Sequence, residues 1–165
     1  MLQKKICMLG AFAVGKTSLV SRYVTSMFSE KYLSTVGVKI DKKTLVVGDE
    51  TVMLMLWDIY GEDSMQKVQM SYLKGASGYL LVADATRRET LDKAASLHER
   101  AREVTGDVPF LLVVNKSDLV AQCEIDDAAL QPLLNQGWSV LRGSAKTGQG
   151  VEEAFSSLTR RMVGG

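Results

Sequence analysis

Residues 10–17 read GAFAVGKT, and this stretch decides the fold because it fits the pattern G-x-x-x-x-G-K-[ST]. It follows the apolar run 6–9, and residues 19–24 after it carry apolar side chains at helical spacing. A glycine-rich turn between a strand and a helix presents backbone N–H groups that bind phosphate oxygens. In that setting Lys16 should reach the terminal phosphates and Thr17 should bind Mg²⁺. The alternative is an ordinary strand-to-helix turn bracketed by glycines.

Apolar runs alternate with helix-period segments along the whole chain. Besides the strand at 6–9, strands are predicted at 38–47, 51–57, 79–83, 110–114 and 138–141, with a glycine-containing hairpin turn at 48–50. Helices are predicted after residue 16, at 89–104, at 127–135, at 151–162 and, less clearly, at 64–74. Pro132 should kink or shorten the third of these. This order predicts a three-layer α/β fold in a single domain, residues 1–165.

Composition excludes several classes of protein. The formal net charge is +1, which gives no electrostatic basis for a nucleic acid partner or a membrane surface. Cys7 and Cys123 are too few for a disulfide framework, which favours a reducing compartment. The apolar runs are too short to span a bilayer, and no lipid-attachment signal is present in the given chain. We therefore expect a cytoplasmic protein with no direct membrane anchor that is monomeric when free.

Ligands bind beyond the carboxyl ends of the strands in such sheets, so polar segments that follow strands are informative. Residues 57–63 read WDIYGED, where a solvated turn is the simplest interpretation. Next to a phosphate-binding loop, however, Asp58 suits a carboxylate that holds Mg²⁺, directly or through a water. Gly61 has no side chain, so its N–H can approach a terminal phosphate closely.

Two further motifs point to guanine. Residues 115–118 read NKSD, and the Asp118 carboxylate can accept hydrogen bonds from the N1–H and the N2 amino group of guanine. Adenine lacks that pair of donors and would leave the acid unpaired. Residues 144–146 read SAK, where the Ala145 N–H can donate to the guanine O6. Each motif alone is weak, but together with the phosphate-binding loop they predict a guanine-nucleotide site.

In order and spacing, these four motifs resemble the Ras-like small GTPase family over nearly the full chain. Residues 32–38 and 72–76 are most similar to the Rab branch. The resemblance implies a phosphate-loop (P-loop) G domain, with a six-stranded, mostly parallel sheet, one antiparallel edge strand and about five helices. It also implies a molecular switch that binds GTP or GDP with Mg²⁺, in which loops 30–39 and 58–72 respond to the nucleotide and bind a protein effector and regulators.

The same resemblance assigns the site residues. The Mg²⁺ ligands would be Thr17, Thr35 and Asp58, and Phe28 would lie against the guanine edge. The nucleotide-binding residues would be Ala13, Val14, Gly15, Lys16, Thr17, Ser18, Phe28, Thr35, Gly61, Asn115, Lys116, Asp118, Ser144, Ala145 and Lys146. Glu62, Gly61 and Lys16 would be the catalytic residues.

Three residues depart from the family pattern near the terminal phosphate. Glu62 replaces the water-orienting glutamine, and an ionised glutamate can only accept hydrogen bonds and repels an anionic phosphoryl group. Tyr60 replaces a small residue, and its ring must either swing out of the site or crowd the approach to it. Phe12 stands where glycine or another small residue is usual. An arginine supplied by an activating protein contributes ~10³–10⁵ in rate in such systems, and Phe12 would obstruct it. We expect slow GTP hydrolysis.

Two alternatives remain open. One is a scaffold or sensor that holds the nucleotide but barely hydrolyses it. The other is a small-molecule kinase with the same loop, against which residues 115–118, residues 144–146 and the lack of an arginine-rich lid argue. Outside the motifs, structural roles are expected for His98 and solvated helix ends for Arg87, Arg88, Arg160 and Arg161.

Overall fold

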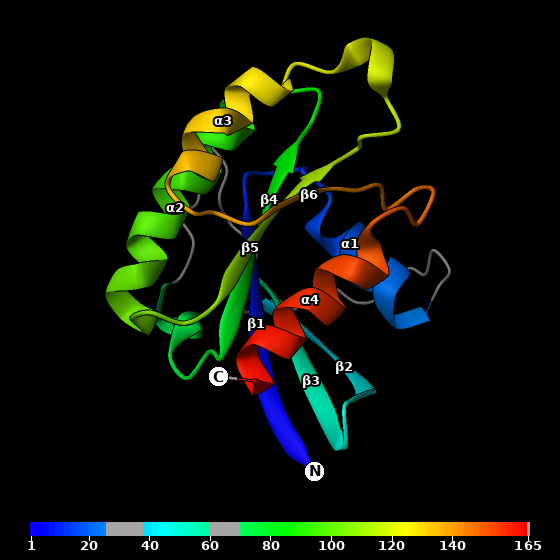
Figure 1. Ribbon diagram of the computed structural model, residues 1–165, viewed down its shortest axis with the longest axis vertical. Helices are drawn as coiled ribbons and strands as arrows, with labels where there is room; N and C mark the ends of the chain where they lie inside the picture. Colours follow the sequence, from blue (N-terminus) through cyan, green and yellow to red (C-terminus); the bar gives the residue numbers. More distant parts are fainter. Residues whose placement is uncertain (26–37, 60–69, 165) are drawn as a thin grey trace.

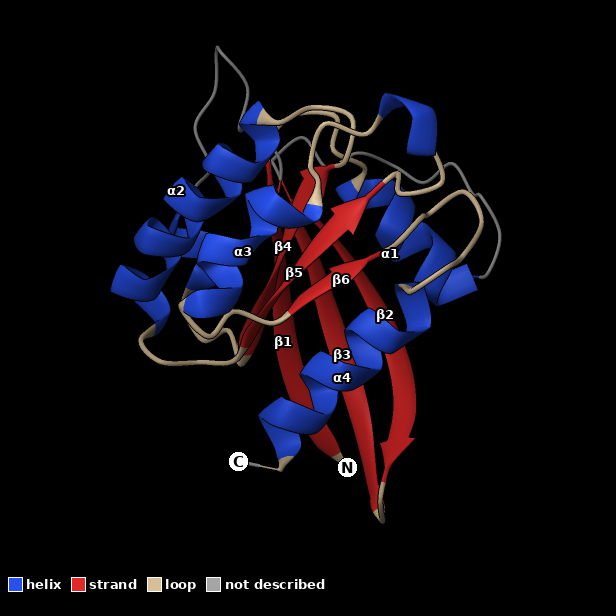
Figure 2. Ribbon diagram, turned by 45° about the horizontal axis from the view of Figure 1, so that its top comes forward, coloured by secondary structure: helices blue, strands red, loops and turns tan. Residues whose placement is uncertain are grey.

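The computed structural model describes residues 1–25, 38–59 and 70–164, which form a six-stranded sheet with helices on both faces (Figures 1 and 2). The strands are β1 (Leu2–Gly10), β2 (Val38–Val47), β3 (Glu50–Ile59), β4 (Gly78–Asp84), β5 (Phe110–Asn115) and β6 (Val140–Arg142). The α-helices are α1 (Lys16–Thr25), α2 (Glu89–Thr105), α3 (Asp127–Asn135) and α4 (Val151–Val163). Two short 3₁₀ helices are η1 (Met70–Leu73) and η2 (Val120–Gln122). The predicted three-layer α/β architecture is confirmed.

The strand order places β1 near the middle of the sheet. Across the sheet the order is β2-β3-β1-β4-β5-β6, where only β2 and β3 pair antiparallel. The chain leaves β1 for the β3 side and later crosses to β4 on its other side. Ligands bind at the carboxyl end of a strand where the chain reverses direction across the sheet in this way. Residues 10–17 begin at that point.

The core forms two layers because side chains alternate along buried strands. In β1, Ile6 and Met8 pack toward α1 and α4, whereas Cys7 and Leu9 pack toward α2 and α3. Every residue of β4 is buried. A strand covered on both faces needs an unbroken apolar run, which explains why the parallel strands were visible in the sequence. Burying each large aliphatic side chain contributes about 1.5–3 kcal/mol.

Details of three elements differ from the predictions. The hairpin loop contains two residues, 48 and 49, with Gly48 at a φ of 60°. Strand β6 begins two residues later than predicted. Pro132 does not shorten α3, which keeps the predicted bounds. Its missing N–H would have paired with the carbonyl of Ala128, an exposed residue to which water has access.

The helix count agrees with the prediction as far as the described residues reach. They contain four α-helices, and residues 70–73 of the weaker candidate 64–74 form η1, while 64–69 lie outside the described residues. Within the described ranges, no helix has the length and apolar character needed to cross a membrane.

An aromatic cluster fixes α2 against the sheet. The Tyr79 hydroxyl lies 2.7 Å from Nδ1 of His98. The imidazole ring lies 4.2 Å from the Phe110 ring and 4.8 Å from the Trp138 ring, measured between centroids. Burial lowers the pKa of His98 below its ordinary value of 6.5; the charge of Glu99 opposes this shift, and the charge of Arg102 adds a smaller contribution to it. His98 is therefore a neutral core residue at physiological pH, in line with the expected structural role.

The lowered pKa of His98 predicts a loss of stability in mild acid. The unfolded chain takes up a proton at this side chain before the folded chain does, so this contribution to the free energy of unfolding is complete above about pH 6.5 and decreases as the pH falls through the folded-state pKa. His98 is the only histidine in the sequence. Urea unfolding between about pH 5 and pH 7.5 should show a slope in the wild type that His98→Phe reduces.

The control for this experiment is a double variant that also removes the Tyr79 hydroxyl, the partner of His98. His98→Phe leaves the buried Tyr79 hydroxyl unpaired and should lower stability at neutral pH by about 1–3 kcal/mol. The double variant Tyr79→Phe/His98→Phe should recover much of that loss while keeping the reduced slope. Identical pH profiles for wild type and His98→Phe would contradict the assignment.

Candidate functional site

The turn between β1 and α1 requires glycine at two positions. A Cβ on Gly10 would lie 2.6 Å from a carbonyl oxygen of β4, and one on Gly15 would lie 2.3 Å from Nδ2 of Asn115. Gly15 has a φ of 100°, and Ala13 adopts a φ of 63° although it carries a side chain. The Lys16 ammonium group donates to the Gly10 carbonyl at 3.1 Å, which closes the turn across its base. The backbone of this loop is thus tightly constrained.

The side-chain amide of Asn115 joins this turn to a second loop. Its Nδ2 donates to the Val14 carbonyl at 2.9 Å, and its Oδ1 accepts from the Ala145 N–H at 3.1 Å. Asn115 is only 2% exposed. The neighbouring Lys116 has a φ of 65° and donates to the Ala13 carbonyl at 3.0 Å. Three segments far apart in the sequence therefore meet at one point.

Asp118 is oriented by the last motif. The Ser144 hydroxyl donates to Oδ1 of Asp118 at 2.7 Å and accepts from the N–H of Thr147 at 3.1 Å. Arg22 of α1 donates to the carbonyls of Lys146 and Thr147, a contact that the sequence pattern did not predict. These contacts hold the third and fourth motifs in fixed relation.

A cavity of about 500 Å³ lies where these motifs meet. It is lined by Gly15, Ser18, Arg22, Asn115, Lys116, Asp118, Leu119, Ser144, Ala145 and Lys146. A larger cavity of about 800 Å³ lies elsewhere, between the residues that follow α2 and the end of α4, and contains none of the predicted site residues. The smaller cavity is the candidate site because its lining brings together side chains that the motifs selected on chemical grounds.

Asp58 and Thr17 meet beside the same turn. The Thr17 hydroxyl donates to Oδ2 of Asp58 at 2.5 Å. Asp58 is fully buried, and within the described ranges its Oδ1 has no hydrogen-bond partner. Burial raises the pKa of this carboxyl, while the Thr17 hydrogen bond and the charge of Lys16 oppose the increase. A buried oxygen pair with one free acceptor fits a hard divalent cation such as Mg²⁺.

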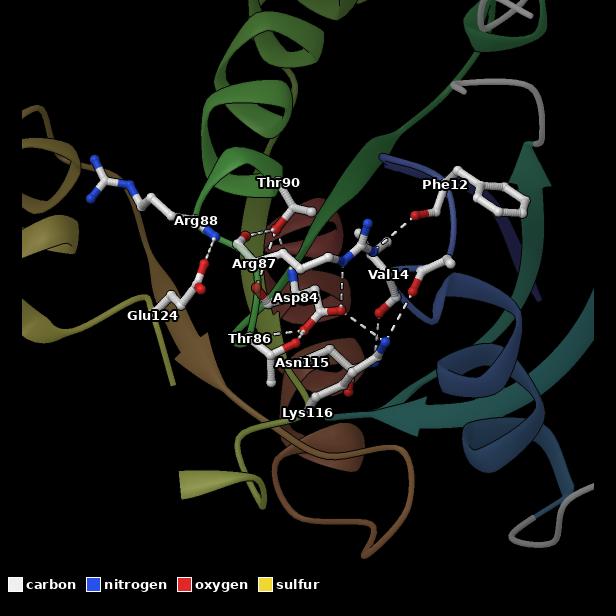
Figure 3. Close-up of polar contacts among 11 residues, drawn as sticks. Phe12, Val14, Asp84, Thr86, Arg87, Arg88, Thr90, Asn115, Lys116 and Glu124 are labelled. Atoms are coloured by element: carbon white, nitrogen blue, oxygen red, sulfur yellow. Dashed lines mark hydrogen bonds and ion pairs between the residues drawn. The ribbon is translucent and has the colours of Figure 1, made fainter. Parts of the chain in front are cut away.

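A second buried carboxylate, Asp84 at the end of β4, lies behind the loop (Figure 3). Its Oδ2 lies 2.8 Å from the Lys116 ammonium and 3.0 Å from Nε of Arg87, and its Oδ1 accepts from the N–H and hydroxyl of Thr86. Burial alone would raise the pKa of Asp84, but hydrogen bonds from Lys116, Thr86 and Arg87 outweigh it and lower the pKa to about 2. The expectation that Arg87 is only a solvated helix end is wrong.

Several predicted site residues lie outside the described residues. They are Phe28, Thr35, Tyr60, Gly61 and Glu62, together with most of loops 30–39 and 58–72. Phe12 is described, and its side chain is 66% exposed at the surface of the phosphate-binding loop. Asp84, Thr86, Arg87 and Arg22 were missed by the motif analysis. The sequence did contain a signal for Asp84: it is an acidic residue directly after the predicted buried strand 79–83, the same pattern that selected Asp58.

Sheet order, loop geometry and the motifs after β1, β3, β5 and β6 together define the α/β domain of small GTP-binding proteins. In agreement, the chain matches the model of the Ras family over residues 5–164 and belongs to this family. It is also 31% identical over 161 residues to "Ras-related protein Rab-1" of Theileria annulata, an alignment that covers 96% of this chain and 73% of that protein. This similarity agrees with the Rab-like pattern of residues 32–38 and 72–76.

The Asn115 amide predicts a measurable contribution to stability. Asn115→Ala leaves the buried Val14 carbonyl without its partner, which should cost about 1–3 kcal/mol. The Ala145 N–H also loses its partner but contributes less, because it is part-buried and lines the cavity. Asn115→Asp should cost more, because a buried charge then faces a carbonyl oxygen. Urea unfolding measures both values.

Asn135→Ala is the matched control. Asn135 accepts a hydrogen bond from Gln131 on the exposed face of α3, so its loss should change stability by no more than about 0.5 kcal/mol. Equal effects of the two alanine substitutions would refute the joining role of Asn115.

Proposed function

We propose that this protein is a switch that binds GTP and GDP and hydrolyses GTP slowly. Members of the Ras family are in general small GTP-binding proteins and GTPases that bind Mg²⁺ with the nucleotide. The observation that carries the proposal for this chain is the double hydrogen bond of Asn115, which joins the phosphate-binding turn to the loop at 144–147. In support of the proposal, Gly15 and Ser18 from the turn and the start of α1 line the same cavity as Asn115, Asp118 and Ala145.

Selectivity for guanine rests on Asp118. Its carboxylate lines the cavity and is held by Ser144 through one oxygen, which orients the group toward a purine edge. Guanine presents two donors to such a carboxylate, while adenine presents no matching pair. We assign the contact with the guanine O6 to the Ala145 N–H, which then has to be shared, because this N–H already donates to Oδ1 of Asn115 at 3.1 Å.

The phosphates are assigned to the turn and the start of α1. Backbone N–H groups of residues 13–18 face the ligand, and the positive end of the α1 dipole adds to their attraction for anions. Mg²⁺ is assigned to Thr17 and Asp58, with Thr35 as a third ligand when GTP is bound. The ion would neutralise charge on the β- and γ-phosphates, and the feature that favours it is Oδ1 of Asp58, which has no hydrogen-bond partner in the part of the chain that the structure describes.

The catalytic assignment is Lys16, Gly61 and Glu62, with a low rate of hydrolysis. Lys16 stabilises charge on the terminal phosphates, Gly61 donates its N–H, and Glu62 orients the attacking water. A glutamate in that role accepts from water but cannot donate to the phosphoryl oxygens. The exposed side chain of Phe12 adds bulk on the side from which a partner's arginine would approach.

The main competing function is a module that holds GTP without turning it over. The observation in its favour is the same three departures, Phe12, Tyr60 and Glu62, beside an otherwise complete set of binding residues. In either case we assign effector and regulator binding to loops 30–39 and 58–72. Monomeric behaviour in the free state, a cytoplasmic location and the lack of a nucleic acid partner complete the proposal.

Guanine selectivity is tested with Asp118→Asn. The substitution keeps an oxygen that can accept from Ser144 but removes the charge that pairs with two guanine donors, so affinity for GDP should fall about a hundredfold. Competition of GDP and ADP against a fluorescent GDP analogue measures the preference. Asp49→Asn in the exposed hairpin turn is the control and should bind like the wild type. Equal binding of GDP and ADP by the wild type would rule out the guanine assignment.

Hydrolysis is tested by single-turnover assays of GTP-loaded protein. Glu62→Gln should be about tenfold faster than the wild type, because glutamine restores a donor and removes a negative charge near the phosphate. Phe12→Gly should have an intrinsic rate near that of the wild type, since it changes access and not charge. Measurable turnover by the wild type, stimulated by an activating protein, would eliminate the inert module, and its absence in wild type and Glu62→Gln alike would eliminate the GTPase.

A further inference from the structure

Three successive carbonyl groups of the phosphate-binding turn each accept a hydrogen bond from a side chain at the end of β5 or just beyond β4 or β5 (Figure 3). The contacts are Arg87 to the Phe12 carbonyl at 2.9 Å, Lys116 to the Ala13 carbonyl at 3.0 Å and Asn115 to the Val14 carbonyl at 2.9 Å. Asn115 and Lys116 belong to a motif that the sequence analysis used. Arg87 belongs to none of the four motifs.

Holding a carbonyl also orients the N–H of the next residue. A trans peptide is planar, and its C=O and N–H groups point in opposite directions. When Arg87 binds the Phe12 carbonyl on one side of the turn, the Ala13 N–H must point to the other. Ala13 needs such a constraint, because its φ of 63° is a conformation that residues with a side chain rarely adopt.

Asp84 keeps Arg87 in the position from which it reaches the turn. The carboxylate is 1% exposed, and both of its oxygens accept hydrogen bonds. The Arg87 guanidinium bridges two groups: its Nε lies 3.0 Å from Asp84, and a terminal nitrogen lies 2.9 Å from the Phe12 carbonyl oxygen. Asp84 also binds Lys116 at 2.8 Å, so one buried anion orients the side chains that hold two adjacent peptides.

We propose that Asp84 and Arg87 are positioning residues for nucleotide binding, which hold the peptide between Phe12 and Ala13 so that the Ala13 N–H faces the phosphates. This inference rests on the proposed function, because it concerns the same turn. Neither Asp84 nor Arg87 is among the residues that line the candidate cavity. Their effect is to fix the phosphate-binding backbone before the ligand arrives, which lowers the ordering that binding requires.

The peptide itself can be observed directly. Among the four phenylalanines of the chain, only Phe12 is followed by alanine. Protein labelled with ¹³C at the phenylalanine carbonyl and ¹⁵N at alanine therefore gives a single one-bond cross-peak, which reports the Phe12 carbonyl and the Ala13 N–H. In nucleotide-free protein Arg87→Ala should shift this peak, because the carbonyl loses a charged hydrogen-bond donor.

Arg88→Ala is the matched control. Arg88 is the adjacent residue, its side chain is exposed, and its contact with Glu124 is made by the backbone N–H, which the substitution keeps. This variant should leave the cross-peak in place. A shift of equal size in both variants would show that the peak responds to a general change at the start of α2.

The functional readout is the rate at which a fluorescent GDP analogue dissociates. Arg87→Ala should release it about tenfold faster than the wild type, whereas Arg88→Ala should not differ. Arg87→Lys keeps the charge beside Asp84, but one ammonium group cannot span both partners as a guanidinium does. It should therefore fold like the wild type and still release the nucleotide several-fold faster.

The outcomes separate the two proposals. An unmoved cross-peak in Arg87→Ala, an unchanged dissociation rate, or full recovery by Arg87→Lys would overturn the positioning role. Failure of the wild type to bind guanine nucleotides would instead refute the proposed function, while the cross-peak would still decide whether Arg87 holds the peptide. Should Arg87→Ala fail to fold, Arg87→Lys provides both measurements.

Discussion

The site depends on one buried amide. Asn115 at the end of β5 reaches the turn after β1 with its nitrogen and the loop after β6 with its oxygen. A primary amide is the smallest side chain that offers a donor and an acceptor in fixed opposition, so neither aspartate nor leucine could replace it. Its reach is short. The carboxyl ends of the parallel strands must consequently lie at matching heights for both bonds to form.

The register of the sheet provides that match. Gly10 pairs with Val82, and Asp84 pairs with Asn115 on the next strand. Val114 in turn pairs with Arg142 of β6. Because side chains alternate along a strand, a shift of one residue would turn Asp84 and Asn115 toward the opposite face of the sheet. The apolar alternation that fills the two core layers is thus the same pattern that aligns the polar site.

The two buried carboxylates at the carboxyl ends of β3 and β4, Asp58 and Asp84, have opposite electrostatic environments. Asp84 is surrounded by two cations and a threonine, and its pKa falls to about 2. Asp58 lies at the end of β3 with burial as the dominant influence, which raises its pKa. Both oxygens of Asp84 accept hydrogen bonds from its neighbours, whereas Oδ1 of Asp58 has no hydrogen-bond partner among the described residues.

Much of this arrangement could be predicted from the sequence, for reasons that can be stated residue by residue. The turn at 10–17 and the motifs at 115–118 and 144–146 are local patterns, so spacing along the chain was enough to find them. Arg87 could not be assigned in this way. Its partner is a backbone carbonyl 75 residues away. Every residue has such a carbonyl, so residue types do not indicate which one a side chain binds. The prediction that Pro132 shortens α3 was wrong, because the carbonyl of Ala128, which loses its N–H partner, is exposed and can accept a hydrogen bond from water.

The site also draws on segments spread across almost the whole chain, and this has a consequence for biosynthesis. Ser144, which holds Asp118, follows all six strands and precedes only α4. During synthesis the turn at 10–17 leaves the ribosome long before the loop at 144–147. The growing chain therefore lacks part of the site until synthesis is nearly complete. Parallel strands with distant partners also pair slowly. A ligand that contacts both the turn and this loop can be retained only after the loop has formed, so its binding would report completed folding.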